Sequence, residues 1–460
     1  MTKKKIGPIA LALVMVAAIV SLRNFPFCAQ YGLSSIFYLG LASLTFFIPT
    51  AQITLELSTT FPGTGGTYHW VKQAYGSETA FLTLWLGWLG TITWFPAILI
   101  FSAAMAYAVI EPIIPGLHFS TYFAFFFIII FFWGTTLINL RGMNVSAVYG
   151  GICVVVGTIL PGILIICLGI FWMAFSQKTQ IDFGIRSLIP ALDIDNIAIF
   201  SAVLLSFSGA ELVSFHVNDT ENPEKTYRKS LFLATILIML IYVLGTLSVI
   251  VIVPNGEINL SSGVLQSFMH FFAELNMNWA VPMIAFALLL GSLAGINSWI
   301  VGPAKGMLAV ADDSLLPNMF RKVNGKDVPY ILLMLQAIVG TILSLFVFLL
   351  AENNDEFLWV LTALAFQFLS IQYIIIFLAA MKLRRKFPEI LRPYRVRFIG
   401  FKCIIAIVAC AITFIITFLP PKSFTTLSFG VYSSSLLAAM IIFVLPVVFL
   451  IKNKRRLLLS

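Results

Sequence analysis

The sequence predicts an all-α membrane protein with twelve transmembrane helices. Its composition is 60% hydrophobic and only 10% charged, whereas soluble domains are about 45–50% apolar and about 25% charged. Apolar runs long enough to cross a bilayer recur along the whole chain, with no polar block between them. Lipid offers no hydrogen-bond partners to the main chain, so such runs must be helices and not open strands. We therefore expect one membrane domain over residues 1–460.

Twelve segments reach the length of about 20 apolar residues that a spanning helix needs. The first follows a lysine-rich start and lacks a small-residue cleavage site, so we expect it to be retained. The predicted spans are 6–31, 35–57, 79–108, 121–140, 146–174, 195–216, 230–253, 279–310, 328–350, 356–381, 400–419 and 426–451.

The positive charges predict the orientation of these spans. Of the 28 lysines and arginines, all except Lys178, Arg186, Lys422 and Arg23 fall in loops or ends on one side of a twelve-span chain. Positive loops stay in the cytoplasm, so we expect both termini there and a location in an inner (plasma) membrane. The net charge of +9 is explained by this asymmetry, and we expect no nucleic-acid partner. The polar stretch 254–278 on the opposite side is typical of a short surface helix.

Two predicted spans carry polar interruptions. The first span contains Ser21, Arg23 and Asn24 before Pro26, and the sixth contains the run 205–211 with Gly209. The two spans are five helices apart, which is the spacing of transporters whose inverted five-helix repeats each begin with a broken helix. Broken halves offer free main-chain groups to both ends of a zwitterion. An ordinary kink at each Pro or Gly is the alternative.

Charged residues inside the spans are few, so each is a candidate for function. Glu211 follows the second interruption and either takes part in coupling, ionised or protonated, or only braces the break. Arg23 either contacts an anionic substrate, pairs with Glu211, or extends toward the outer face. Glu56, at the cytoplasmic end of the second span, is expected to be an anchor or gate residue. Trp94 and Trp299 lie mid-span beside small or polar residues, which favours positions near a substrate.

Several short motifs resemble those of the glutamate/GABA antiporters, a group of the amino acid–polyamine–organocation superfamily. The resemblance covers essentially the whole chain. Its most specific pieces are 298–307, 256–261, 65–71 and 209–211 with 216–218 and 222–223.

This resemblance implies a LeuT-like fold with two inverted five-helix repeats, approximately 6–174 and 195–381, and two extra helices over 400–451. It implies that main-chain groups around the two breaks hold the amino-acid end of the substrate, and that Glu211 matches a sixth-helix glutamate. Spans 3, 8 and 10 would line the site. The residues at the breaks are Ile19, Val20, Ser21, Leu22, Ser206, Phe207, Ser208 and Gly209, and the lining candidates are Arg23, Trp94, Asn297, Trp299 and Gln367.

The chain departs from the acid-resistance glutamate antiporters in two places. Those relatives have a glutamate four residues before the position of Trp299, where this chain has Gly295. They also have a long C-terminal tail that closes the inward path, whereas this chain ends at Ser460. We therefore expect no tail-gated pH control.

The sequence as a whole predicts a secondary amino acid transporter, most simply an antiporter that works by alternating access. A transporter-like sensor without flux and an intramembrane enzyme are the alternatives. No spacing suggests a catalytic triad, and the four histidines are scattered, so we expect no covalent chemistry, no metal and no cofactor. The expected partners are an amino acid or amine and membrane lipid, with a homodimer left open.

Overall fold

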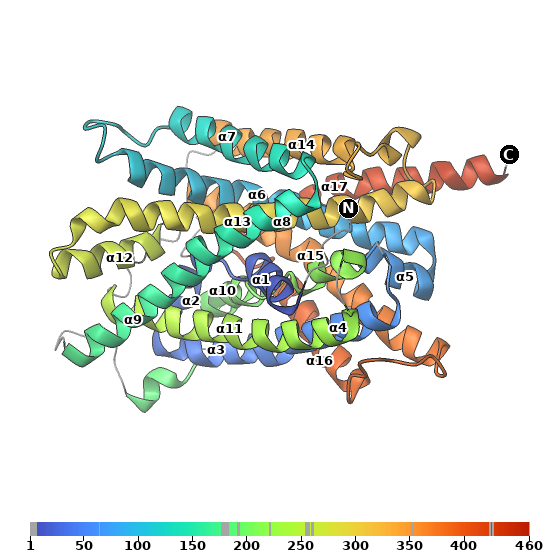
Figure 1. Cartoon of the computed structure of the whole chain (residues 1–460), viewed down its shortest axis with the longest axis horizontal. Coiled ribbons are helices and arrows are strands. Elements are labelled where there is room, and N and C mark those ends of the chain that lie inside the picture. Colours follow the sequence, from blue (N-terminus) through green and yellow to red (C-terminus); the bar gives the residue numbers. More distant parts are fainter. Residues whose placement is uncertain are drawn as a thin grey trace.

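The computed structural model describes residues 7–63, 65–175, 184–190, 194–219, 222–253, 258, 262–350, 354–422, 425 and 427–459. Within these residues the protein is entirely helical (Figure 1). The α-helices are α1 (Pro8–Ile19), α2 (Phe25–Ala29), α3 (Ser35–Ala42), α4 (Ile48–Thr60), α5 (Thr67–Tyr75), α6 (Ser77–Ile110), α7 (Thr121–Leu140), α8 (Met143–Val154), α9 (Leu160–Phe175), α10 (Ile194–Leu205), α11 (Pro223–Ile252), α12 (Gly263–Glu274), α13 (Val281–Asp312), α14 (Tyr330–Leu350), α15 (Asn354–Lys386), α16 (Ile399–Ile416) and α17 (Phe429–Leu459).

Shorter helical turns join or interrupt these helices. The 3-10 turns are η1 (Leu22–Asn24), η2 (Gly32–Ser34), η5 (Ile185–Leu188), η6 (Ala210–Asp219), η7 (Asn278–Ala280) and η8 (Asn318–Arg321). Two π-helical turns, η3 (Ser43–Phe47) and η4 (Val155–Ile159), lie inside the second and fifth spans.

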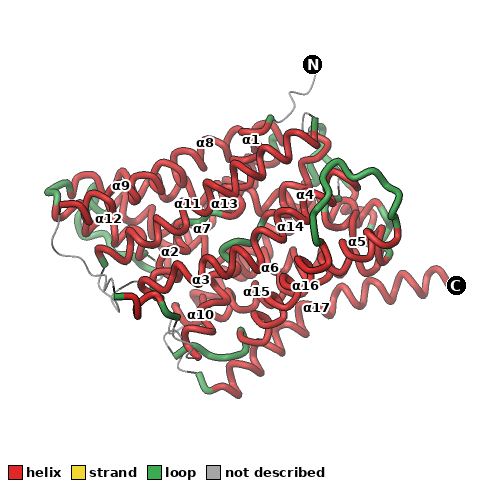
Figure 2. The backbone as a smooth tube through the Cα atoms, turned by 90° about the horizontal axis from the view of Figure 1, so that it is seen from below, coloured by secondary structure: helices red, strands yellow, loops and turns green. Residues whose placement is uncertain are grey.

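The predicted spans all have helical counterparts. Eleven helices of the described chain are long and apolar enough to cross a bilayer, and the apolar helix over Tyr330–Phe346 supplies the remaining predicted segment. The spans run roughly side by side, with α17 at the edge of the bundle (Figure 2). Large apolar side chains such as Ile442, Phe449 and Leu445 point outward from α17, as expected where lipid replaces water. The multi-span helical architecture is therefore confirmed.

Small residues let the central helices pack closely. A side chain on Gly157 in η4 would collide with the main chain of Gly291 in α13, so these two helices touch backbone to backbone. Such contacts between small residues are the usual means of helix association in lipid. They fix the position of α13, which lines the centre of the molecule.

Two short helices lie between spans. Helix α5 joins the second and third spans, and α12 falls within the predicted surface segment 254–278. One side of α12 is buried, with Val264, Phe268 and Phe271 packed inward, so the helix also covers the end of the bundle near η1 and α2. The motif 256–261 lies outside the described residues except for Ile258, as do the side chains of 216–218.

Candidate functional site

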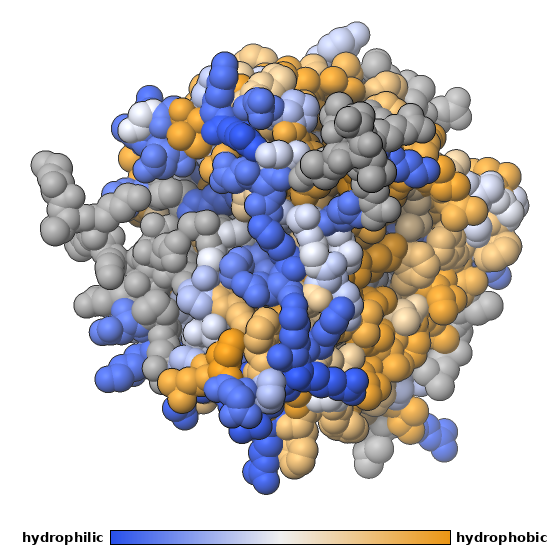
Figure 3. All heavy atoms as spheres, turned by 90° about the vertical axis from the view of Figure 1, so that its right-hand side faces the viewer, coloured by the Kyte–Doolittle hydropathy of each residue, from blue (hydrophilic) through white to orange (hydrophobic). Residues whose placement is uncertain are grey.

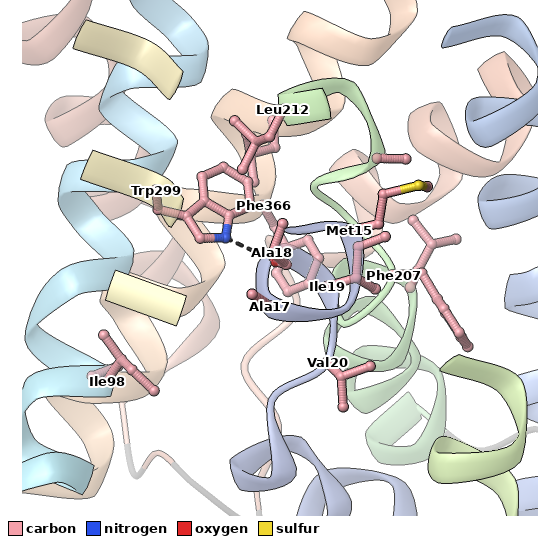
Figure 4. Close-up of a cluster of buried hydrophobic side chains, with 14 of the residues drawn as sticks. Met15, Ala17, Ala18, Ile19, Val20, Ile98, Phe207, Leu212, Trp299 and Phe366 are labelled. Carbon is pink, nitrogen blue, oxygen red and sulfur yellow. Dashed lines mark hydrogen bonds between the residues drawn. The ribbon is translucent and has the colours of Figure 1, made fainter. Parts of the chain in front are cut away.

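Both predicted interruptions are real breaks in the helices. Helix α1 ends at Ile19, and Val20 and Ser21 are extended, with φ of −81° and −120°, before η1 and α2 resume. Pro26 lies in the first turn of α2, where a missing N–H does no harm. Helix α10 ends at Leu205, and the helical path resumes as η6 at Ala210. The two breaks lie next to each other, with Ile19 and Val20 facing the segment that carries Phe207 (Figure 4).

Gly209 makes the second break possible. Its φ is +114°, a conformation that residues with a Cβ rarely adopt. A Cβ at this position would also come within 2.9 Å of the Ala18 carbonyl oxygen and 3.2 Å of the Trp299 ring. The glycine therefore allows the two broken spans to approach each other closely.

Side chains from other spans satisfy several of the freed main-chain groups. The Trp299 indole N–H donates to the Ala18 carbonyl at 2.9 Å (Figure 4). The Tyr373 hydroxyl accepts the Gly209 N–H at 3.0 Å and donates to the Glu211 carboxylate at 2.5 Å. Since an unpaired main-chain group is costly in lipid, these contacts hold the breaks in place.

Tyr242 of α11 joins the two breaks through one hydroxyl group. This oxygen lies 2.9 Å from the carbonyl oxygens of both Ile19 and Ser206. It also accepts from the Asn24 amide at 3.2 Å and lies 3.4 Å from the Ser21 main-chain nitrogen. A single buried phenol thus ties the first interruption to the second.

A cavity of about 750 Å³, counted with its open mouth, lies against the two breaks. The third, eighth and tenth spans complete its walls, as the sequence predicts. From α6, α13 and α15 these walls include Gly90, Thr91, Trp94, Ile98, Gly291, Ser292, Gly295, Trp299, Thr362, Phe366 and Leu369.

Most of the predicted site residues gather at this cavity. Of the residues at the breaks, Ile19, Val20, Ser21, Ser206 and Ser208 line it, together with Arg23, Trp94 and Trp299. The rings of Trp94 and Trp299 lie 6.0 Å apart. Leu22, Phe207 and Gly209 are not among the described residues that line the cavity. Phe207, for example, packs on Phe47 and on Tyr242.

Asn297 does not join the described residues that line the central cavity. It lies two positions from Trp299 on α13. Side chains two positions apart on an α-helix point about 200° away from each other. Its side chain accepts from Asn139 at 3.0 Å and from Ser146 at 3.2 Å, and it borders a second cavity between α1, α8 and α13.

Gln367 also lies outside the described wall of the central cavity. The cavity-lining residues of α15 are Thr362, Phe366 and Leu369, which are spaced along one face of the helix. Gln367 falls beside that face and is completely buried, with no hydrogen-bond partner for its amide in the part of the chain that the structure describes.

The described residues support neither of two alternatives for Arg23, a pair with Glu211 or an extension to the outer face. It is 6% exposed, so it does not extend to an outer aqueous face. It makes no ion pair with Glu211, whose carboxylate is held by Tyr373. Arg23 lines the cavity instead, and its guanidinium lies 5.7 Å from the Phe27 ring.

Little in the sequence pointed to the roles of Tyr242 and Tyr373. Each is an aromatic residue in an apolar span, and most such residues only pack. The one available signal was the polar phenol oxygen in the middle of a span, since a group of this kind needs a partner in lipid.

The charges at the end of the bundle that carries α5 are paired, in contrast to Arg23. Glu56 accepts from Arg384 at 2.6 and 3.0 Å and from the Val396 N–H at 2.6 Å, and it forms an ion pair with Arg392 at 3.2 Å. Hydrophilic residues cover much of this end (Figure 3). The predicted role of Glu56 as an anchor agrees with these contacts, which tie α4 to α15 and to the segment before α16.

A smaller charged group lies beside it on the same end. Lys72 pairs with Asp313 at 2.5 Å, and the Tyr68 hydroxyl donates to the same carboxylate. Burial and the neighbouring Asp313 carboxylate raise the pKa of Tyr68 above its ordinary value, so the phenol stays protonated and remains a donor. These contacts join α5 to the end of α13.

Comparison with known proteins supports the family resemblance that the sequence motifs indicate. The chain matches the amino acid permease family over residues 6–446. It is 34% identical to an uncharacterised transporter of Legionella pneumophila over 99% of this chain and 98% of that protein. It is 27% identical to a glutamate/gamma-aminobutyrate antiporter of Lactococcus lactis over 99% of this chain and 92% of the relative.

A third relative has a different substrate in its name. A Lactococcus lactis protein described as a probable agmatine/putrescine antiporter is 25% identical over 80% of this chain and 77% of its own length. The resemblance to the glutamate/GABA antiporters is thus confirmed within a wider group. With a match over nearly the whole chain, two broken spans and one cavity between them, this protein belongs to the amino acid permease family.

Proposed function

We propose that this protein exchanges amino acids, or the amines derived from them, across the plasma membrane by alternating access. The observation that carries the proposal is the central cavity, which lies against two facing helix breaks. Similarity to antiporters over most of the chain supports exchange as the mode of transport.

The two breaks supply the chemistry for an amino-acid end. We propose that main-chain groups of 19–22 and 206–209 hold this end of the substrate, and Ile19, Val20, Ser21, Ser206 and Ser208 line the cavity. Free carbonyls favour an ammonium group, and the N-terminal end of η6 favours a carboxylate. No covalent step is needed, because the substrate only has to bind differently to the two states of the protein.

Glu211 is suited to couple binding to the change of state. It is 2% exposed and lies directly behind the second break, where Tyr373 joins its carboxylate to Gly209. A change in the protonation of this carboxylate would alter the hydrogen bonds that hold the break. We therefore propose Glu211 as a coupling residue and not as a direct substrate ligand.

We also propose that the α5 end of the bundle and both termini face the cytoplasm. Lys72, Arg384 and Lys386 belong to the positively charged set that the loop charges assign to that side. A fluorescent protein that folds only in the cytoplasm, fused after Ser460, should fluoresce. A dark fusion with a normal expression level would reverse the orientation.

The repeat boundaries 6–174 and 195–381 belong to the same proposal. They are supported by the positions of the breaks, which fall in the first span of each half. The remaining segment, 400–451, contains α16 and most of α17.

Counterflow in proteoliposomes tests the proposed exchange. Vesicles that contain the purified protein and a high internal concentration of one unlabelled amino acid should accumulate the labelled form faster than vesicles that contain the protein but no internal amino acid. Each amino acid and its decarboxylated amine should be tried in turn. Ligand-induced thermal stabilisation without counterflow for any of them would identify a sensor and contradict the proposal.

A further inference from the structure

The central cavity carries a single ionisable side chain among the described residues that line it, and that residue is Arg23. The remaining walls consist of main-chain groups, small or apolar residues, hydroxyls of serine and threonine, and the amide of Asn24. The charge of this cavity therefore constrains the substrate. The inference below rests on the proposed transport function and narrows its substrate class.

Arg23 has no anionic partner among the residues that the structure describes. Its side chain is 6% exposed, and no hydrogen bond or ion pair to its guanidinium is found in the described part of the chain. Phe27 provides one cation–π contact at 5.7 Å. Buried charges are normally paired because an isolated ion in a medium of low dielectric constant is strongly destabilised. An arginine left unpaired at a cavity wall is therefore a receptor for an anion.

Glu211 does not neutralise this charge. Its carboxylate is engaged by the Tyr373 hydroxyl at 2.5 Å, and it is absent from the described residues that form the cavity wall. The α13 wall adds no acid either, since Gly295 stands there between Trp94 and Ala17, each 3.8 Å from the position of a Cβ. The described wall of the cavity therefore carries one positive charge.

We propose that Arg23 is an anion subsite that binds a second carboxylate, so that the preferred substrates are acidic amino acids. The main-chain groups of the breaks hold the α-amino and α-carboxylate groups, and the guanidinium pairs with the side-chain carboxylate in the planar, two-point geometry that arginine favours. A substrate of net charge −1 makes the occupied cavity neutral.

Net charge is what separates the competing substrates. A neutral amino acid leaves the charge of Arg23 uncompensated, and a diamine adds positive charges beside it. Like charges at short distance in a medium of low dielectric constant repel strongly. The site should therefore reject diamines such as agmatine and putrescine, although one relative is described as carrying them.

Counterflow with matched substrate pairs tests this subsite. The full-length protein is reconstituted, and glutamate is compared with glutamine, aspartate with asparagine, and both pairs with putrescine and agmatine. Each acid and its amide have nearly the same shape, so the pair isolates the charge. For the wild-type protein we expect a half-saturation concentration at least about ten-fold lower for the acid than for its amide, and no exchange of the diamines.

Two substitutions of the arginine sharpen the test. Arg23→Gln should abolish the preference for acids while exchange of the amide persists, and Arg23→Lys should keep a reduced preference. Arg141→Gln, at an exposed arginine just after α7, is the matched control and should behave as the wild type. If Arg23→Gln does not reach the membrane, the comparison of acid with amide in the wild type still tests the anion subsite.

The outcomes separate this inference from the proposed function. Equal exchange of acid and amide by the wild type, or efficient exchange of a diamine, would overturn the anion subsite and leave amino acid transport intact. An unchanged preference for acids in Arg23→Gln would also overturn it. Absence of exchange for every amino acid and amine would instead remove the proposed function itself.

Discussion

Two arginine-containing regions of this protein treat a buried charge in opposite ways. At the α5 end, Glu56 is surrounded by Arg384, Arg392 and the Val396 N–H, so each charge has its partner within the chain. At the central cavity, Arg23 is also buried, and the described part of the chain supplies no such partner. Pairing fixes a structure, whereas an unpaired charge at a cavity leaves room for a ligand. The predictions below test this contrast, from the largest expected effect to the smallest.

Removing the charge of Glu56 should cause the largest loss of stability. Glu56→Gln keeps the shape of the side chain but leaves two largely buried arginines without their carboxylate. Breaking a buried pair in this way costs about 3–5 kcal/mol. The thermal midpoint of the purified protein should fall by many degrees, while Glu389→Gln, at an exposed position in the following loop, should leave it unchanged. Equal midpoints for the two variants would show that the Glu56 cluster does not hold the helices.

Gly209→Ala should disrupt the second break. The residue has a φ of +114°, and the added Cβ would press on the Ala18 carbonyl, at a cost of about 1–3 kcal/mol for the backbone strain alone. Because the strain falls on the cavity wall, counterflow should be lost before the protein unfolds. Gly134→Ala is the control, since a Cβ there has open space around it. Normal exchange by Gly209→Ala would separate the break from substrate binding.

Tyr242→Phe should weaken the link between the two breaks without removing the ring. The ring packs against Phe25 and Phe207, and those contacts remain. Loss of the hydroxyl removes the single donor that the carbonyls of Ile19 and Ser206 share, at about 1–3 kcal/mol for the group left unsatisfied. We expect a half-saturation concentration for counterflow that is raised about ten-fold.

Tyr107→Phe is the control for this change, because its hydroxyl donates only to the Leu117 carbonyl in the loop after α6. An identical effect in both variants would mean that the Tyr242 hydroxyl has no special role at the breaks.

Lys72→Gln should have the smallest effect. The Lys72 side chain is 43% exposed and that of Asp313 is 26% exposed, and pairs that water can reach contribute about 0–1 kcal/mol. The thermal midpoint should change little, and the size of this change should fall as the salt concentration rises. Lys322→Gln, at an exposed lysine nearby, gives the baseline. A shift as large as that of Glu56→Gln would contradict the distinction between buried and exposed pairs.

The fold and the breaks could be predicted because their causes are local. Long apolar runs specify the spans, and Ser21, Pro26 and Gly209 mark where a helix must stop or restart. The walls of the cavity from α6 and α13 were predicted through Trp94 and Trp299, which stand among small residues.

The remaining features depend on packing, which a single sequence does not display. Asn297 is a predicted lining residue of the eighth span, but the helical angle between it and Trp299 turns it to a different cavity. The partners of Glu56 lie more than 300 residues away in the chain. The roles of Tyr242 and Tyr373 likewise depend on which helices meet, and not on their immediate neighbours.

The most direct test of the account is an experimental structure of the protein with a bound amino acid. The ligand should be the one that gives the largest thermal stabilisation. Its α-amino and α-carboxylate groups should lie at the main chain of 19–22 and 206–209, with its second carboxylate at Arg23. A ligand bound instead in the cavity beside Asn297, with the region around Arg23 empty, would contradict the account.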